Sequence, residues 1–165
     1  MKQTFPASLR FAPFPLEEER ELFLRCYEDT WRIAHGSLDG FEPESVFRSA
    51  LIRGSVSPEA TLGLWSGEEF LGLIAFDERR GRREKLLWIS FLYVTPEHRG
   101  EGLGRALIER AGERAGTLGR RELQLCTARG NPALEFYGAL GFRVCGTEPG
   151  ALEPLLRLRL LVAEK

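Results

Sequence analysis

The hydrophobic positions of this chain fall into stretches spaced for strands and stretches spaced for helices. Nine residues without a charge, Leu86–Val94, are rich in aromatic and β-branched side chains and lead into Thr95 and Pro96. This pattern predicts a strand buried on both faces, and Pro96 ends it because proline cannot donate to a strand ladder. The rest of the chain is organised around this central strand.

Helical spacing is clearest before the central strand. Leu16–His35 begins with three glutamates, carries apolar residues on one face and ends with basic residues before Gly36, so it predicts a helix. Pro43 opens a shorter predicted helix that closes at Gly54. The other predicted strands are short apolar or alternating runs: Ser8–Phe14, Thr61–Trp65, Phe70–Phe76, Glu122–Thr127, Phe142–Cys145 and Leu155–Val162.

Two further helices are predicted after the central strand. Apolar residues recur at helical spacing from Leu103 to Leu118, and Asn131-Pro132 is a helix start whose helix ends at Gly141. The arginine-rich stretch 77–85 is typical of a solvated turn, because an RNA-binding patch would interleave aromatic residues. Strands and helices in this order indicate a mixed α/β sheet.

Three alternating glycines, Gly100, Gly102 and Gly104, lie between the central strand and the next helix. A helix N-terminus carries free N–H groups and partial positive charge, and glycines let an anion approach that backbone, so the turn predicts a phosphate site. A Walker loop is excluded because no lysine follows a glycine, and a dinucleotide fingerprint would place its last glycine at Arg105 or Leu107.

Two segments resemble the GNAT superfamily of N-acetyltransferases. Arg99–Gly104, RGEGLG, is similar to its acyl-CoA signature, and Asn131–Phe142, NPALEFYGALGF, is similar to its second signature, although Ala133 stands one position earlier than in the pattern. The resemblance implies an α/β (α+β) GNAT fold in a single domain, residues 1–165, with a mixed sheet of about six to seven strands and about four helices.

The resemblance also implies an acetyl-CoA-dependent acyltransferase. The acyl group would pass to a primary amine of a small molecule or peptide by direct attack on the thioester, while the central strand and the strand at Glu122–Thr127 splay apart to admit the pantetheine arm. The N–H near Val94 would polarise the thioester carbonyl. The implied cofactor-binding residues are Leu92, Val94, Arg99, Gly100, Glu101, Gly102, Leu103, Gly104, Arg105 and Asn131.

Tyr137 matches the family tyrosine that protonates the departing thiolate, so it is the implied catalytic residue. Each of three residues also has a purely structural interpretation. Tyr137 is also compatible with an apolar helix face, Asn131 with a helix cap, and Arg105 with a solvated helix position.

The acceptor side is less determined by sequence. The resemblance places the acceptor between loops at about residues 36–42 and 146–153, where His35 is either a base or a structural residue at a helix end. Trp88 occupies the position at which histone-modifying relatives carry a glutamate base, which argues against a histone-type enzyme. It offers either an aromatic wall or core packing. The remaining candidates for amine deprotonation or attraction are water, Ser90, Glu28, Asp39 and Glu42.

Composition limits the cellular location and the partners expected for the protein. With a formal net charge of −1, no long apolar run and no signal-peptide pattern, the 165 residues predict a cytoplasmic protein without a nucleic-acid or membrane partner. Cys26, Cys126 and Cys145 are expected to be small buried hydrophobes, and no metal site is expected. A homodimer, a non-catalytic acyl-CoA-binding sensor and a nucleotide-binding α/β protein stay open at this point.

Overall fold

The computed structural model describes residues 8–163 and contains one sheet with the strand order β1-β2-β3-β4-β5-β7-β6. The strands are β1 Leu9–Pro13, β2 Thr61–Ser66, β3 Glu69–Asp77, β4 Leu86–Val94, β5 Glu122–Thr127, β6 Arg143–Glu148 and β7 Leu155–Leu161. Neighbouring strands are antiparallel except β4 and β5, which are parallel. The sequence shows no signal-peptide pattern at its N-terminus, and residues 1–7 of that segment lie outside the described residues.

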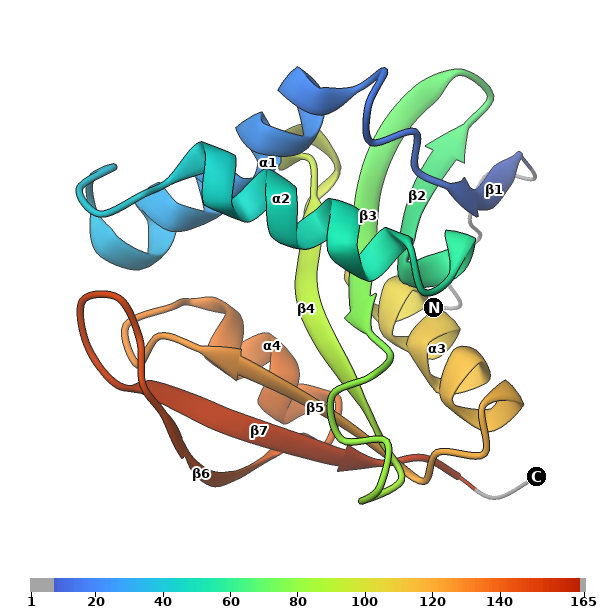
Figure 1. Ribbon diagram of the computed structural model, residues 1–165, viewed down its shortest axis with the longest axis vertical. Coiled ribbons are helices and arrows are strands. Elements are labelled where there is room, and N and C mark those ends of the chain that lie inside the picture. Colours follow the sequence, from blue (N-terminus) through green and yellow to red (C-terminus); the bar gives the residue numbers. More distant parts are fainter. Residues whose placement is uncertain (1–7, 164–165) are drawn as a thin grey trace.

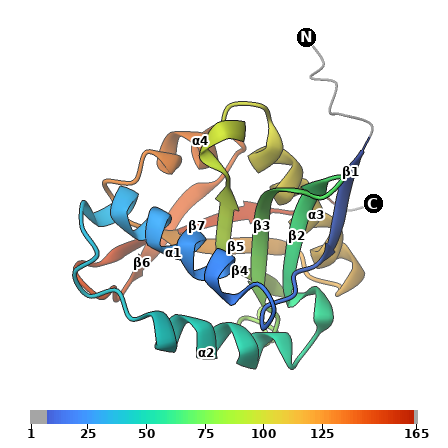
Figure 2. The same cartoon turned by 90° about the horizontal axis from the view of Figure 1, so that it is seen from above.

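Among residues 8–163, four α-helices are present, and they lie on the two faces of the sheet (Figures 1 and 2). They are α1 Arg20–His35, α2 Pro43–Gly54, α3 Leu103–Thr117 and α4 Ala133–Ala139, with short 3-10 helices η1 Pro58–Ala60 and η2 Pro96–His98. Helices α1 and α2 lie on one face, and α3 and α4 lie on the other. The predicted mixed α/β sheet is confirmed. No helix among residues 8–163 combines the length and apolarity needed to cross a bilayer.

Alternation along the strands builds two hydrophobic cores. Ile74 and Phe76 of β3 pack with α3 and α4, whereas Leu73 and Ala75 pack with α1 and α2. Neighbouring side chains of one strand point to opposite faces, so a central strand covered by helices on both sides has no polar face. This explains why the run Leu86–Val94 carries no charge.

Some element ends differ from the predictions. Helix α1 begins at Arg20 and not at Leu16, because Glu19 has non-helical torsion angles of −111° and 34°. Residues 16–19 form a turn in which the Glu19 N–H donates to the Pro15 carbonyl. The predicted Phe142–Cys145 strand is observed as β6, Arg143–Glu148, because its pairing with β7 continues into the hairpin.

The central strand is irregular where it leaves its neighbours. β4 pairs with β5 only from Leu86 to Trp88, although both strands continue beyond that point. On its other edge, Phe76 pairs with Ile89 and Ala75 with Phe91, so Ser90 is an extra residue in a bulge. A bulge bends a strand and redirects its side chains. The splayed arrangement expected for β4 and β5 is therefore present in the structure, and it opens the sheet at its centre.

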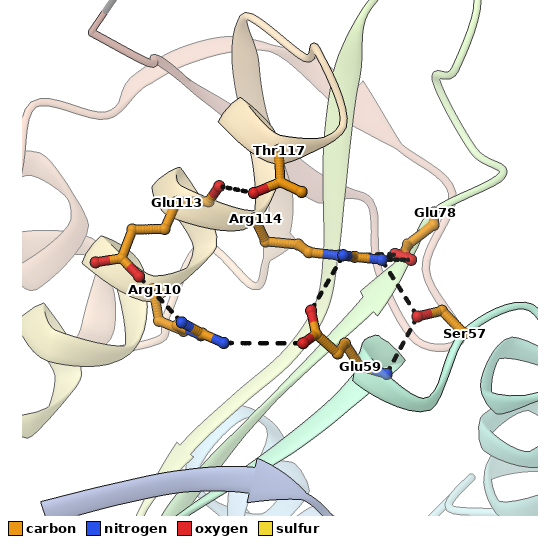
Figure 3. A network of polar contacts seen from close by, with 7 residues as sticks. All are labelled: Ser57, Glu59, Glu78, Arg110, Glu113, Arg114 and Thr117. Carbon is orange, nitrogen blue, oxygen red and sulfur yellow. Dashed lines mark hydrogen bonds and ion pairs between the residues drawn. The ribbon is translucent and has the colours of Figure 1, made fainter. Parts of the chain in front are cut away.

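The arginine-rich segment 77–85 is only partly the solvated turn that its composition predicts. Glu78 is 7% exposed and pairs with Arg114 of α3, whose Nη2 lies 2.7 Å from Glu78 Oε1. Ser57 and Glu59 complete this network, which joins α3 to the segment before β2 (Figure 3). Sequence reasoning missed it because the partners are distant along the chain.

Candidate active site

A cavity of about 810 Å³ lies where β4 and β5 separate, and it reaches both faces of the sheet. All the predicted site residues except Glu101 line it, contributed by β4, the glycine turn, α3 and α4: Leu92, Val94, Arg99, Gly100, Gly102, Leu103, Gly104, Arg105, Asn131 and Tyr137. The structure thus gathers segments that are about forty residues apart in sequence around one space.

Glu101 does not line the cavity and forms part of a charge cluster at the turn. His98, which does line the cavity, has Nδ1 3.2 Å from Glu101 Oε2 and Nε2 2.8 Å from Glu69 Oε1. These hydrogen bonds, to Glu69 first and then to Glu101, raise the pKa of His98 above its ordinary value. The cluster therefore favours a cationic imidazolium beside the glycine turn.

The glycine turn places the N-terminus of α3 at the cavity. Gly102 caps the helix with φ of 84°, a left-handed conformation that residues with a Cβ rarely adopt. Gly104 serves a packing role, because a Cβ at that position would lie 2.8 Å from Phe136 Cζ of α4. The turn thus combines an exposed helix N-terminus with a close contact between the two helices that flank the cavity.

The edge of β4 that faces the cavity has the polar backbone groups that an extended ligand needs. Thr95 N donates to Leu71 O of the β3 side at 2.9 Å, so backbone alternation directs the polar groups of Val94 and Leu92 toward the opposite, open edge. No β5 residue pairs with β4 beyond Trp88. An amide-containing arm fits this edge as an added strand.

The side chain of Arg99 is held within the protein. Its Nε donates to the Val94 carbonyl at 3.0 Å, and its Nη2 lies 2.9 Å from Asp29 Oδ2 of α1. The Tyr93 hydroxyl donates to the same Asp29 oxygen at 2.8 Å. This network anchors the start of the glycine turn to β4 and α1, so Arg99 can offer an anion its backbone while its guanidinium holds the turn.

Tyr137 lies on α4 in the core beneath the cavity and is 8% exposed. Its ring contacts Phe142 edge to face at a centroid distance of 5.5 Å, and no hydrogen-bond partner for its hydroxyl is present within residues 8–163. Burial raises the pKa of Tyr137 to about 12. The hydroxyl therefore keeps its proton at neutral pH.

Asn131 and Arg105 occupy the two remaining predicted positions. Asn131 Oδ1 accepts a hydrogen bond of 2.9 Å from Ala133 N, so the predicted capping of α4 is observed while the residue also lines the cavity. Arg105 is exposed at the rim, where its charge favours an anionic ligand.

The acceptor is expected between residues 36–42, which follow α1, and residues 146–153, which include the loop between β6 and β7. Gly40 of the first loop lies close to Leu152 of the second loop and to Trp31 of α1, since a Cβ there would be 3.4 Å from Leu152 and 3.6 Å from Trp31. The two loops expected to flank the acceptor therefore meet, and Figure 1 shows them on the same side of the sheet opening. His35 and Ser90 line the cavity.

Several sequence candidates on the acceptor side do not line the cavity. Glu28, Asp39 and Glu42 lie outside it, and so does Trp88, which is 7% exposed with the Arg80 guanidinium 3.4 Å above its ring. Trp88 therefore packs in the interior and is not an aromatic wall of the cavity. Its position was matched to the glutamate of histone-modifying relatives by counting back six residues from Val94, but the bulge at Ser90 lies within that count and shifts the register.

Sequence reasoning missed the ring-bearing residues that form the α1 side. Tyr27 and Trp31 both line the cavity, and with His35 they recur every four residues along α1. That spacing places side chains on one helix face, so it was a usable signal. Tyr93 and Phe91 complete this side from β4, but their direction depends on the bulge and was not predictable from spacing alone.

Comparison with known proteins agrees with this geometry. A sequence model of the acetyltransferase (GNAT) family matches residues 16–142. An uncharacterized N-acetyltransferase of Methanocaldococcus jannaschii is 40% identical over 71 residues. That match covers 42% of this chain and 31% of the relative's length.

Two solved structures share the fold. A PaiA N-acetyltransferase of Thermoplasma acidophilum in complex with coenzyme A has a TM-score of 0.64 at 20% identity, covering 92% of this chain and 98% of that one. A spermidine N-acetyltransferase of Vibrio cholerae in complex with CoA and spermine has a TM-score of 0.69 at 19% identity, covering 95% and 97%. The chain belongs to the acetyltransferase (GNAT) family, and the resemblance found in its two motifs is confirmed.

Proposed function

We propose that this protein transfers an acetyl group from acetyl-CoA to a primary amine of a small molecule or peptide. The observation that carries the proposal is the cavity between β4 and β5, which joins a helix N-terminus suited to a diphosphate to a buried, protonated Tyr137. Family membership supports acyl transfer from acetyl-CoA. The amine class is proposed from the cavity, because none of its described lining residues is a glutamate of the kind that histone-modifying relatives use as a base.

The proposed reaction is a direct attack. The amine nitrogen bonds to the thioester carbonyl carbon, the oxyanion that forms is held by the backbone N–H near Val94, and the carbon–sulfur bond then breaks. The Tyr137 hydroxyl gives its proton to the departing thiolate, and the amine releases a proton to water or to a cavity group such as His35. The products are the N-acetylated amine and free CoA.

A covalent acyl-enzyme route is disfavoured by the chemistry of the one cysteine on the cavity wall. Burial, together with the charge of Glu148, raises the pKa of Cys126 to about 11. The thiolate is the nucleophilic form of cysteine, so the raised pKa disfavours the reactive form of Cys126 at neutral pH. Among the described residues, no group of three or more His, Cys, Asp or Glu side chains is placed to hold a metal.

The test is amine-dependent thiol release from acetyl-CoA by the wild type and by Tyr137→Phe. The phenylalanine keeps the ring and its contact with Phe142, so kcat should fall by about a hundredfold or more while the Kd for CoA stays within about twofold. With the pKa of Tyr137 raised to about 12, the wild-type rate should show no alkaline decrease from this group below about pH 10.

Two results would count against the proposal. CoA-induced thermal stabilisation without thiol release from any amine would indicate a binding module of this fold. Radiolabelled acetyl retained on the denatured protein would indicate an acyl-enzyme.

A further inference from the structure

The α1 side of the cavity is lined by rings and aliphatic side chains. Tyr27 stacks on Phe91 at a centroid distance of 3.8 Å, and Trp31 is fixed by a hydrogen bond of 3.1 Å from Nε1 to the Asp39 carbonyl. Ile33 and Leu155 extend this apolar lining toward the rim. These residues face the side of the sheet opposite to the glycine turn, where an acceptor can approach the thioester without crossing the site of the diphosphate.

Negative charge is missing from this lining. Among the described residues that line the cavity, none is Asp or Glu. The lining does include the cationic side chains of Arg99 and Arg105, and His98, whose raised pKa favours its protonated form. Carboxylates in contact with cavity-lining side chains are already paired: Asp29 Oδ2 accepts from Tyr93 and Arg99, and Glu69 and Glu101 bond to His98. A second ammonium group on the acceptor would therefore be buried against the apolar α1 side without a counter-ion.

The rings do not compensate for that missing charge. An aromatic face can hold a cation, but the Arg99 guanidinium already lies 5.4 Å from the Tyr93 ring centroid. Tyr27 and Phe91 cover each other's faces at an interplanar angle of 20°. The Trp31 ring packs against His35 and Phe41 at centroid distances of 4.5 Å and 5.7 Å. The α1 side thus offers mainly apolar contact area to a substrate.

From this geometry we infer that the acceptor is a primary amine carried on an alkyl or aryl group without a second positive charge. This inference rests on the proposed acetyl transfer and narrows its substrate class. The reacting amino group binds as the free base, so one amine loses its charge on entering, whereas the second ammonium of a diamine keeps it. Polyamines and aminoglycosides are therefore expected to be poor acceptors, although the protein has the same fold as a spermidine N-acetyltransferase.

The test compares hexylamine with cadaverine, which has an ammonium in place of the terminal methyl at the same chain length, and adds spermidine. Wild-type kcat/KM for hexylamine should exceed that for cadaverine by about tenfold or more, because a buried methyl is favourable and a buried unpaired charge is costly. Equal or faster turnover of cadaverine or spermidine would overturn the inference and leave acetyl transfer intact. Thiol release from none of the three amines would also overturn the inference, and release from no amine or peptide, with CoA still bound, would in addition remove the proposed function.

A variant tests whether the α1 side of the cavity causes the expected preference for hexylamine over cadaverine. Ile33 lies on α1 at the cavity, is 42% exposed and tolerates a polar side chain, so Ile33→Glu should raise the kcat/KM ratio of cadaverine to hexylamine by about fivefold or more. Ile52→Glu is the matched control, since Ile52 is 56% exposed on α2 and does not line the cavity. If Ile33→Glu keeps the wild-type ratio, the α1 side does not contact the acceptor and the inference is wrong.

Discussion

His98 shows how one residue of the turn links stability to pH. Its ring bridges Glu69 of β3 and Glu101 of the glycine turn, and both hydrogen bonds favour the protonated ring and so raise its pKa. The stabilisation from a raised folded-state pKa is fully present below the unfolded value of about 6.5 and is lost as pH rises through the folded value. The bridge therefore stabilises the turn most in mildly acidic solution.

His98→Gln is expected to remove this pH dependence. The wild type should exceed His98→Gln in unfolding free energy at about pH 6, and the difference should shrink by about pH 8.5 as the wild-type ring loses its proton. Urea denaturation of both proteins across this pH range measures the difference. Both proteins retain His35, so any effect of that histidine is the same in the two measurements. A difference that stays constant with pH would show that His98 contributes only packing.

For single residues, the sequence predicted those roles that depend only on neighbouring residues in the chain. Asn131 caps α4 because its side chain reaches the amide two positions on, and Gly102 adopts the left-handed conformation that a glycine allows. Roles that depend on distant partners were not predictable. Gly104 was interpreted as part of a phosphate turn, but its missing side chain also accommodates Phe136, and Arg99 is tied to Asp29.

The N-terminal turn of α3 is the element that should bind the CoA diphosphate. Gly102→Glu strains a backbone with φ of 84° and places a carboxylate where the phosphates are expected, so the Kd for CoA should rise by about tenfold or more. Isothermal titration measures this change, with a thermal melt of the free variant to show that it folds.

Gly112→Glu is the matched control on the same helix. No atom lies within 4 Å of a Cβ built at Gly112, and glutamate favours a helix interior over glycine. Its CoA affinity should equal that of the wild type. A folded Gly102→Glu protein with unchanged affinity would place the diphosphate elsewhere.

The C-terminal half of α3 depends on a charge network and not on a ligand. Arg114 is 15% exposed and Glu78 5% exposed at their side chains, so removal of one partner leaves a charge in a poorly solvated site (Figure 3). Glu78→Ala should lower the unfolding free energy by about 3 kcal/mol, the low end for a broken buried pair, because Arg114 retains Glu59 and Ser57.

Glu113→Ala provides the comparison for that loss in the same urea titration. The pair between Arg110 and Glu113 is exposed on the helix surface with a separation of 3.1 Å, and such a pair contributes only about 0.3 kcal/mol. Similar losses in the two variants would mean that Glu78 is not an important anchor of α3.

Elements with a self-contained pattern were predicted most accurately. β4 has the bounds that its uncharged run predicts, and α2 begins at the expected proline and ends at Gly54. Predictions were less accurate where the tertiary structure decides the conformation. The glutamates before α1 indicated an early helix start, but the chain turns at residues 16–19, and the bulge at Ser90 carries no signature in the sequence.

On the scale of the whole molecule, the sheet is two parts joined at one short contact. β1 to β4 form one part, β5 to β7 form the other, and β4 pairs with β5 only from Leu86 to Trp88. The cavity occupies the rest of that boundary, so a ligand there contacts both parts. Binding should therefore stabilise the molecule across the opening as well as at the glycine turn.

Hydrogen exchange with and without CoA tests this coupling. A CoA arm along the open edge of β4 should slow amide exchange in residues 89–94 of β4 and also in β5 and α4, while global stability rises by about 2.7 kcal/mol at a hundredfold excess over Kd. ADP carries the diphosphate without the pantetheine arm, so its protection should stay within the glycine turn and the start of α3. If CoA protects no more than ADP does, the arm does not enter the opening between β4 and β5, and the two parts of the sheet are not coupled by the co-substrate.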